Sequence, residues 1–138
     1  KLLNELDKSI NIVFVNELNE VFLECDKEQI SRVFLNVIKN SIESIQQRSE
    51  NVNNFNKKIT IELTDNDNQI IAVITDNGIG FGNFKNNVKY SLNPYITTKK
   101  NGTGLGLSIV NKIINDHNGK IEFVPVNEGA KIKLFFTK

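Results

Sequence analysis

Three glycines at alternate positions lie in the segment Asn101–Ser108, directly before an apolar run with helical spacing. They are Gly102, Gly104 and Gly106. Because glycine has no Cβ, it lets a ligand approach the main chain closely. A helix that begins there offers unpaired N–H groups and the positive end of its dipole, and both favour a phosphate group. The pattern therefore predicts a phosphate-binding loop. The alternative is a flexible loop before an ordinary helix start.

A second candidate site is a strip of polar residues on a predicted helix. Asn36 and Asn40 are four residues apart, so they stack on one strip beside the apolar face, and Glu43 falls on the same strip. Amide and carboxylate oxygens suit a hard cation such as Mg²⁺, which commonly takes only one or two protein ligands. The strip is therefore a candidate Mg²⁺ site, and the alternative is a solvated helix surface in an Asn-rich chain.

The third motif is Asp76-Asn77-Gly78-Ile79-Gly80, which directly follows a strongly apolar predicted strand. A carboxylate at the C-terminal end of a buried strand lies where sheet proteins bind ligands. It can accept a hydrogen bond from an exocyclic amino group, such as that of adenine, while the glycines leave space for the ring. A simple Asn-Gly turn is the alternative interpretation.

A fourth segment, Asn93–Lys100, lies between the two glycine motifs. Here Tyr95 is followed by Thr97, Thr98 and Lys99. An aromatic ring, two hydroxyls and a lysine could close over a nucleotide and contact its phosphates. Taken singly, the segment is a loop.

Periodicity predicts the elements that must position these motifs. Asp26 is a candidate N-cap, with Gln29 completing a capping box, and apolar residues then recur at helical spacing to about Gln47. A second helix is expected from about Gly104 to His117, ending at a glycine C-cap. The predicted strands are Ile10–Val15, Val21–Cys25, Lys58–Thr64, Gln69–Thr75, Lys120–Val124 and Lys131–Phe136. This order favours an α+β fold, with helices on one face of a mixed sheet and Ile70–Ile74 near its centre.

Composition limits the class of protein. The 138 residues fit one domain, and a net charge of +1 gives no global field that would favour nucleic acid as a partner. No apolar run is long enough to span a membrane, and the N-terminus has no signal-peptide pattern. The only cysteine, Cys25, is expected to be a small buried hydrophobe, and the only histidine, His117, to be structural. The absence of methionine favours a fragment excised from a longer protein.

Taken together and in this order, the motifs resemble a known family. Asn-x₃-Asn on a helix, Asp-x-Gly-x-Gly after a strand and Gly-x-Gly-x-Gly before a helix are similar to the N, G1 and G2 boxes of sensor histidine kinases. Asn93–Lys99 looks like their F box, and the resemblance covers about Ile10 to Phe136. Asn40–Ser44 and Pro94–Lys99 look most like the nitrogen-regulation sensors of the NtrY/NtrB type.

The resemblance implies a fold and a domain organisation. The expected fold is the two-layer α/β sandwich of these ATP-binding domains, the Bergerat fold, with a mixed sheet of about five strands backed by about three helices. Residues 1–138 would form a single catalytic, ATP-binding domain. Its ATP lid would span about residues 81–101.

The same resemblance implies ATP and Mg²⁺ as cofactors. Asn40 would be the Mg²⁺ ligand, Asn36 a helper near the phosphates, and Lys99 a phosphate contact, so these three are the candidate catalytic residues. Glu43 departs from the basic residue that many of these kinases have at its position. That departure argues against a lysine phosphate contact from this helix.

The remaining implied residues would bind the nucleotide. Asp76 would accept a hydrogen bond from the adenine amino group, and Gly78 and Gly80 would make room for the base. The other implied contacts to the nucleotide are Tyr95, Thr97, Thr98, Gly102, Thr103, Gly104, Leu105, Gly106 and Leu107.

The implied reaction transfers the γ-phosphoryl group of Mg²⁺-ATP to a histidine on a dimerisation domain, for relay to a response-regulator receiver domain. His117 lacks the context of that acceptor, a histidine followed by an acidic residue and an arginine. The acceptor helices are therefore expected before Lys1. A cytoplasmic location is expected, without contact to nucleic acid or to a membrane by this fragment.

The enzyme alternative is an ATPase of the gyrase, Hsp90 or MutL type, which shares the fold and the Asp-x-Gly-x-Gly motif. In those enzymes a Glu four residues before the Mg²⁺ asparagine is the general base on water, whereas Asn36 is an amide that cannot take the proton. Such a site suits a kinase, because phosphoryl transfer depends mainly on positioning and charge stabilisation. An anti-sigma-factor Ser/Thr kinase and a nucleotide-binding pseudokinase module are further alternatives.

Overall fold

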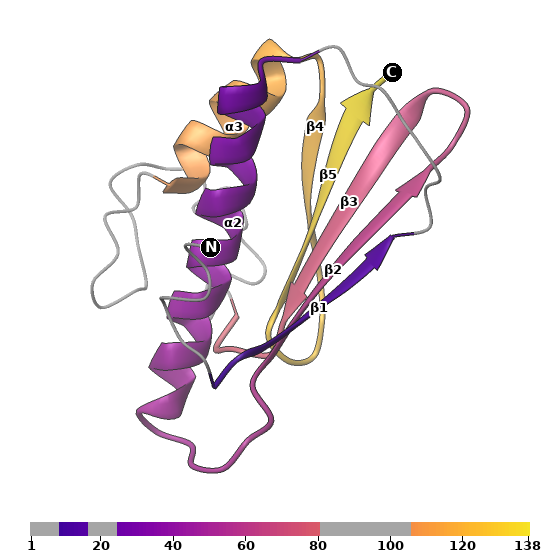
Figure 1. The fold of residues 1–138 in the computed structure, drawn as a ribbon. Helices are drawn as coiled ribbons and strands as arrows, with labels where there is room; N and C mark the ends of the chain where they lie inside the picture. Colours follow the sequence, from indigo (N-terminus) through magenta and orange to yellow (C-terminus); the bar gives the residue numbers. More distant parts are fainter. Residues whose placement is uncertain (1–8, 17–24, 81–105) are drawn as a thin grey trace.

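The computed structural model describes residues 9–16, 25–80 and 106–138, which form a sheet of five strands covered on one face by two helices (Figure 1). The strands are β1 (Asn11–Asn16), β2 (Lys58–Asp65), β3 (Gln69–Asp76), β4 (Lys120–Val124) and β5 (Ala130–Thr137). The helices are α2 (Lys27–Ser49) and α3 (Gly106–Asp116). The two-layer α/β sandwich is confirmed, although the described residues contain two helices where about three were predicted.

The sheet is mixed and has the order β1-β2-β3-β5-β4. Only β1 and β2 pair in parallel, and the other pairs are antiparallel. The predicted central position of Ile70–Ile74 is confirmed, because β3 lies between β2 and β5. The ladder continues to Asp76, one residue beyond the predicted end, since Asp76 pairs with Ile59 on β2 and Ala130 on β5.

Helix α2 forms where the capping residue and the apolar spacing predict it. The Asp26 carboxylate accepts hydrogen bonds from the backbone N–H groups of Glu28 and Gln29, at 3.1 and 3.2 Å, and so satisfies two of the unpaired donors of the first turn. The buried residues lie on one side of the helix, since each has another buried residue three or four positions away: Val33, Val37, Ile38, Ser41, Ile42, Ser44 and Ile45. This spacing turns one face of α2 onto the sheet.

The core lies between this helical face and alternate residues of the strands. Ile61, Ile74 and Ile132 pair across β2, β3 and β5, and all three are buried. The ring of Phe34 on α2 stacks on that of Phe136 on β5, with ring centroids 6.1 Å apart. Because paired residues of neighbouring strands share a face, this row gives the helices a continuous apolar surface to pack on.

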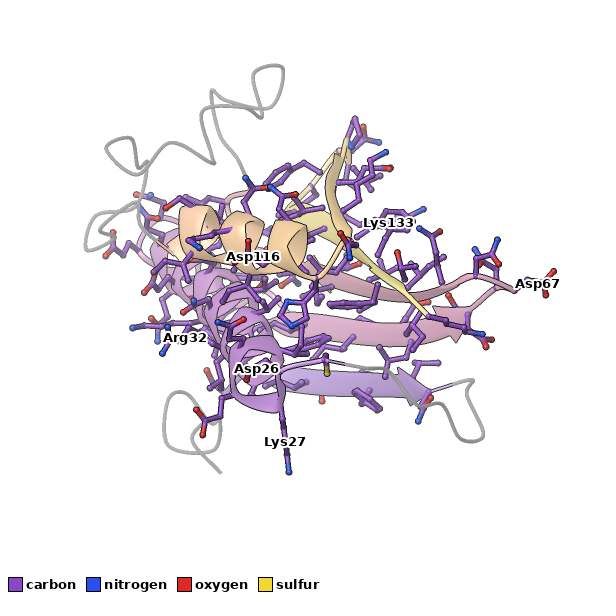
Figure 2. All side chains as sticks on the ribbon, turned by 90° about the horizontal axis from the view of Figure 1, so that it is seen from above. Asp26, Lys27, Arg32, Asp67, Asp116 and Lys133 are labelled. Atoms are coloured by element: carbon purple, nitrogen blue, oxygen red, sulfur yellow. The ribbon has the colours of Figure 1, made fainter. Side chains whose placement is uncertain are left out.

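Helix α3 lies beside α2 (Figures 1 and 2). It ends in a Schellman motif. The Gly119 N–H donates to the Ile114 carbonyl at 2.8 Å, and the Asn118 N–H donates to the Asn115 carbonyl at 3.1 Å. The residue in the left-handed conformation is Asn118, with φ of 58°, and not the glycine of the predicted cap. Gly119 is required for space, because a Cβ there would contact the Phe135 carbonyl oxygen.

His117 has the structural role expected of it. Its Nε2 accepts a hydrogen bond from the Asp26 N–H at 3.1 Å, and its Nδ1 lies 2.8 Å from the Ile113 carbonyl oxygen. Since Nε2 accepts, the proton is assigned to Nδ1, which donates to that carbonyl. The imidazole thereby joins the end of α3 to the beginning of α2.

The prediction for Cys25 was wrong. Its side chain is exposed, and Cys25 lies in a bend just before the helix cap, so it is not part of a strand. At that point the chain turns into α2, and the alternation of a strand no longer applies. The rest of the predicted strand, residues 21–24, lies outside the described residues.

Helices long and apolar enough to cross a membrane are absent from the described ranges.

Candidate functional site

A polar strip runs along α2 at four-residue intervals. Asn36, Asn40, Ser44 and Arg48 lie on it, and this spacing stacks side chains on one helix surface. Asn36 and Asn40 are half-buried, Ser44 is buried, and the Arg48 side chain is 21% exposed. The predicted placement of the two asparagines beside the apolar face agrees with this, and Glu43 is also half-buried.

Asp76 provides a buried carboxylate at the end of the central strand. It is 5% exposed and alternates with the core residues of β3, so its side chain lies on the face that carries the helices. Its Oδ1 accepts a hydrogen bond from the Gly78 N–H at 2.9 Å. Because a buried carboxylate needs hydrogen-bond donors, the loop that follows β3 both supplies one and fixes the orientation of the group.

The loop after Asp76 is held against α2 by polar contacts. The Arg48 Nη1 donates to the Asn77 carbonyl at 2.5 Å. The Ile79 N–H donates to the Ser44 carbonyl at 3.2 Å, and the Gly80 N–H donates to the Ser44 Oγ at 3.2 Å. Three of the four residues 77–80 therefore hydrogen-bond to the C-terminal half of the polar strip, at Ser44 and Arg48.

Gly78 is held by packing instead. A Cβ at this position would lie 2.5 Å from the Ser44 carbonyl carbon and 2.6 Å from the Ile45 nitrogen. Only a glycine permits the strand end to approach the helix backbone this closely. The prediction that Gly78 leaves room for a base stays a prediction, because the contact found here is with α2.

The turn between β4 and β5 closes the other side of the loop. Gly80 and Gly129 both have a φ of 75°, a left-handed conformation that favours glycine. A Cβ on Gly80 would contact the Gly129 carbonyl oxygen, and a Cβ on Gly129 would contact the Asp76 carbonyl oxygen. The loop that follows Asp76 is thus enclosed between α2 and this turn.

Asn77 and Arg48 are residues that the sequence reasoning did not single out. The Asn77 Oδ1 accepts from the Lys58 N–H at 3.0 Å, and its Nδ2 donates to the Asn56 carbonyl. Arg48 also pairs with the Glu128 carboxylate at 2.5 Å and lies 4.2 Å above the Phe55 ring. The four-residue spacing after Asn40 could have identified Ser44 and Arg48, but nothing local to the sequence indicates the partners of Arg48.

The glycine-rich motif lies partly within the described residues. Gly106 and Leu107 are the first two residues of α3, and Leu107 packs against the core. The predicted helix is therefore confirmed from Gly106 onward, and its expected start at about Gly104 lies outside the described residues. The other predicted contacts lie outside the described residues: Tyr95, Thr97, Thr98, Lys99, Gly102, Thr103, Gly104 and Leu105.

Comparison with protein families and curated proteins agrees with the resemblance found in the motifs. A family model described as histidine kinase-, DNA gyrase B- and HSP90-like ATPase matches residues 25–138. The nitrogen regulation protein NtrY of Azorhizobium caulinodans is 35% identical over 111 residues, which are 79% of this chain and 14% of that protein. The sensory histidine kinase/phosphatase NtrB of Azospirillum brasilense is 33% identical over 106 residues, 71% of this chain and 26% of that protein. The likeness to sensors of the NtrY/NtrB type is thus confirmed.

Solved structures share the fold. The nucleotide-free catalytic domain of the histidine kinase ThkA has a TM-score of 0.77 at 27% identity, covering 94% of this chain and 81% of that chain. The mycobacterial sensor histidine kinase MprB agrees in fold, with a TM-score of 0.78 at 19% identity over 99% of this chain and 87% of that chain. Two curated relatives match 99% of this chain, but the chain spans only 21% of their length. The likeness therefore concerns one segment of larger proteins.

Proposed function

Because the chain belongs to the family of histidine kinase-, DNA gyrase B- and HSP90-like ATPases, we propose that it is the catalytic, ATP-binding domain of a sensor histidine kinase. Residues 1–138 would act as one domain, with residues 81–101 as its ATP lid. The domain would bind Mg²⁺-ATP and transfer the γ-phosphoryl group to a histidine on the dimerisation domain of the same kinase. The phosphoryl group would then pass to a response-regulator receiver domain.

The buried carboxylate of Asp76 supports this proposal most directly. It lies at the end of the central strand, on the face that carries the helices, and is followed by the loop that hydrogen-bonds to the polar strip of α2. One of its oxygens already accepts the Gly78 N–H. A carboxylate held in this way would accept a hydrogen bond from the exocyclic amino group of adenine.

The amides of α2 fit the phosphate end of the nucleotide. Asn40 would bind Mg²⁺ through its side-chain oxygen, while the ion takes its other ligands from phosphate and water. Asn36, one turn earlier, would lie near the phosphates. Lys99 and the residues from Gly102 to Leu107 would contact the triphosphate, and Tyr95, Thr97 and Thr98 would belong to the part of the lid that covers it.

The amide at position 36 supports transfer over hydrolysis. A hydrolysing relative would need a general base there to take a proton from water, and an amide cannot accept that proton. The γ-phosphoryl group would therefore be kept for the acceptor histidine. The chain's own contribution is to hold the nucleotide and compensate the charge of the transferring group.

The principal test is phosphotransfer to the parent protein's own acceptor. The domain is incubated with Mg²⁺, γ-labelled ATP and the histidine-bearing dimerisation domain of the parent protein. We expect an acid-labile and base-stable label on that domain. ATP binding without any label would contradict the kinase proposal and favour a pseudokinase. Steady phosphate release by this domain alone, lost on replacing a carboxylate such as that of Glu43, would favour the ATPase.

A matched pair of variants tests the assignment of Asp76. Asp76→Asn should weaken ATP binding by about 10- to 100-fold, because a hydrogen bond to a charged group contributes about 1.5–3 kcal/mol. Asp67→Asn is the control, since Asp67 is exposed at the tip of the β2–β3 hairpin, far from α2 (Figure 2). Isothermal titration calorimetry measures both affinities. Equal ATP affinity in Asp76→Asn and the wild type would refute the adenine assignment.

A further inference from the structure

We propose that Ser44 and Arg48 are positioning residues for base recognition. They lie one and two turns beyond Asn40 on the same strip of α2, and they hold the loop that orients the Asp76 carboxylate. This inference rests on the proposed function, because it takes Asp76 as the acceptor for the adenine amino group. It adds a second role for α2. The helix would present Asn36 and Asn40 to the phosphates, and its next two turns would fix the position of the group that recognises the base.

Arg48 joins three segments of the chain through one guanidinium group. It donates to the Asn77 carbonyl at 2.5 Å, pairs with Glu128 at 2.5 Å and stacks over Phe55 at 4.2 Å. These partners lie in the loop after β3, in the β4–β5 turn and in the connection between α2 and β2. Because the guanidinium is planar and its donors point in fixed directions, these contacts set both the distance and the direction of the Asn77 carbonyl.

Ser44 holds the next part of the same loop. Its carbonyl accepts the Ile79 N–H, its Oγ accepts the Gly80 N–H, and the residue is only 4% exposed. The loop cannot move away from α2 without breaking these bonds. It cannot move closer either, because Gly78 is already in contact with the backbone of Ser44.

The position of the loop determines the orientation of Asp76. Its Oδ1 accepts the Gly78 N–H at 2.9 Å, and Gly78 lies between the two residues that Arg48 and Ser44 hold, Asn77 and Ile79. A shift of the loop would therefore rotate the carboxylate away from the direction of the base. Since Asp76 would contact only the exocyclic amino group, Ser44 and Arg48 should affect recognition of that group and leave the phosphate contacts unchanged.

The test compares ATP with inosine triphosphate, which carries an oxo group where adenine has its amino group. Calorimetric affinities for both nucleotides are measured for the wild type, Arg48→Gln and Arg32→Gln. We expect the wild type to bind ATP more tightly than inosine triphosphate. In Arg48→Gln, the ratio of the two affinities should be about tenfold smaller, in line with a weakened hydrogen bond to a charged group. Arg32→Gln, the same change at an exposed residue of α2 that points away from the sheet, should keep the wild-type ratio (Figure 2).

Two further variants separate positioning from folding. Arg48→Lys should have a ratio of ATP to inosine triphosphate affinity between those of Arg48→Gln and the wild type. An ammonium group can still donate to the Asn77 carbonyl but cannot make all three contacts. Ser44→Ala removes the acceptor for the Gly80 N–H while favouring the helix, and should lower the ratio less than Arg48→Gln does. If thermal unfolding shows that Arg48→Gln does not fold, Ser44→Ala decides the question.

The outcomes distinguish the two proposals. A fall in affinity that is equal for ATP and inosine triphosphate, or an unchanged ratio in the folded variants, would overturn the positioning role and leave the kinase proposal standing. A wild type without preference between the two nucleotides would also overturn it. A wild-type domain that binds neither nucleotide would contradict the proposed function itself.

Discussion

Within the described residues, the dipeptide Asn-Gly occurs at the end of β3 and again at the end of α3, and the two copies have different structural roles. Asn118 adopts a left-handed backbone, with φ of 58°, and ends α3. Asn77 stays outside that region of φ and uses its side chain, which bonds to the backbone of Lys58 and Asn56. One asparagine thus works through its backbone conformation and the other through its amide.

The two glycines are required by space and not by backbone angle. A Cβ on Gly78 would meet the backbone of α2 at Ser44 and Ile45, whereas one on Gly119 would meet the Phe135 carbonyl oxygen on β5. The neighbours of Gly78 include the candidate site, while those of Gly119 only join α3 to the sheet. Both of these Asn-Gly dipeptides therefore lie at crowded places in the fold, and only the one after β3 adjoins the candidate site.

Gly78→Ala should have the largest effect. The added Cβ would lie 2.5–2.6 Å from backbone atoms of a helix, which cannot rotate aside. We expect a loss of about 3 kcal/mol in the free energy of unfolding, at the upper end for an overpacked site, and a more than tenfold loss of ATP affinity. Urea unfolding and calorimetry measure the two quantities. A stable variant with wild-type affinity would contradict the role of the α2 contact in positioning Asp76.

Gly119→Ala should destabilise the fold without altering the site. Its Cβ would lie under 3.0 Å from one backbone atom, the Phe135 carbonyl oxygen at 2.3 Å, whereas a Cβ on Gly78 would lie that close to two backbone atoms and the Ser44 Oγ. The second neighbour of Gly119, the Ile114 Cγ2 at 3.1 Å, belongs to a side chain that can shift. We expect a loss of about 2 kcal/mol in the free energy of unfolding and unchanged ATP affinity of the folded protein. The comparison between the two glycines fails if this variant loses ATP affinity as Gly78→Ala does.

Asn77→Ala should cost about 1–2 kcal/mol of unfolding free energy, because two hydrogen bonds to backbone groups are lost. Asn77→Gly should be no better, since the lost amide and not the backbone conformation is the cause. Chemical denaturation of the two variants side by side checks this expectation. Recovery of stability in Asn77→Gly would show that the backbone conformation matters here after all.

At Asn118, the glycine variant should be more stable than the alanine variant, the opposite of the result expected at Asn77, and the changes in unfolding free energy should be smaller. Asn118→Ala should cost about 1 kcal/mol, because alanine lacks the short polar side chain through which asparagine tolerates the left-handed region. Asn118→Gly should stay within about 0.5 kcal/mol of the wild type, since glycine adopts that conformation freely. Melting temperatures of the pair provide the measurement, and a glycine variant as unstable as the alanine variant would contradict the backbone explanation.

Much of the fold could be predicted from local patterns. The Asp26 cap and the apolar spacing after it predicted α2, and the continuous apolar run Ile70–Ile74 predicted the central strand. Cys25 was misplaced because a run of apolar residues does not show where a strand ends and a turn into a helix begins. The polar strip was recognised at Asn36 and Asn40, but its continuation to Arg48 was not, because an arginine near a helix end is usually solvated.

The sequence by itself determined most of the described elements, the order of the three motifs and, through that order, the family. These properties depend on residue types at short spacing, which set helix, strand and turn preferences wherever they occur. Only the tertiary structure decided that the Gly80 N–H bonds to Ser44, 36 positions away, and that Arg48 reaches Asn77, 29 positions away. Such contacts depend on how closely β3 approaches α2, and that distance follows from the packing of the whole core between them.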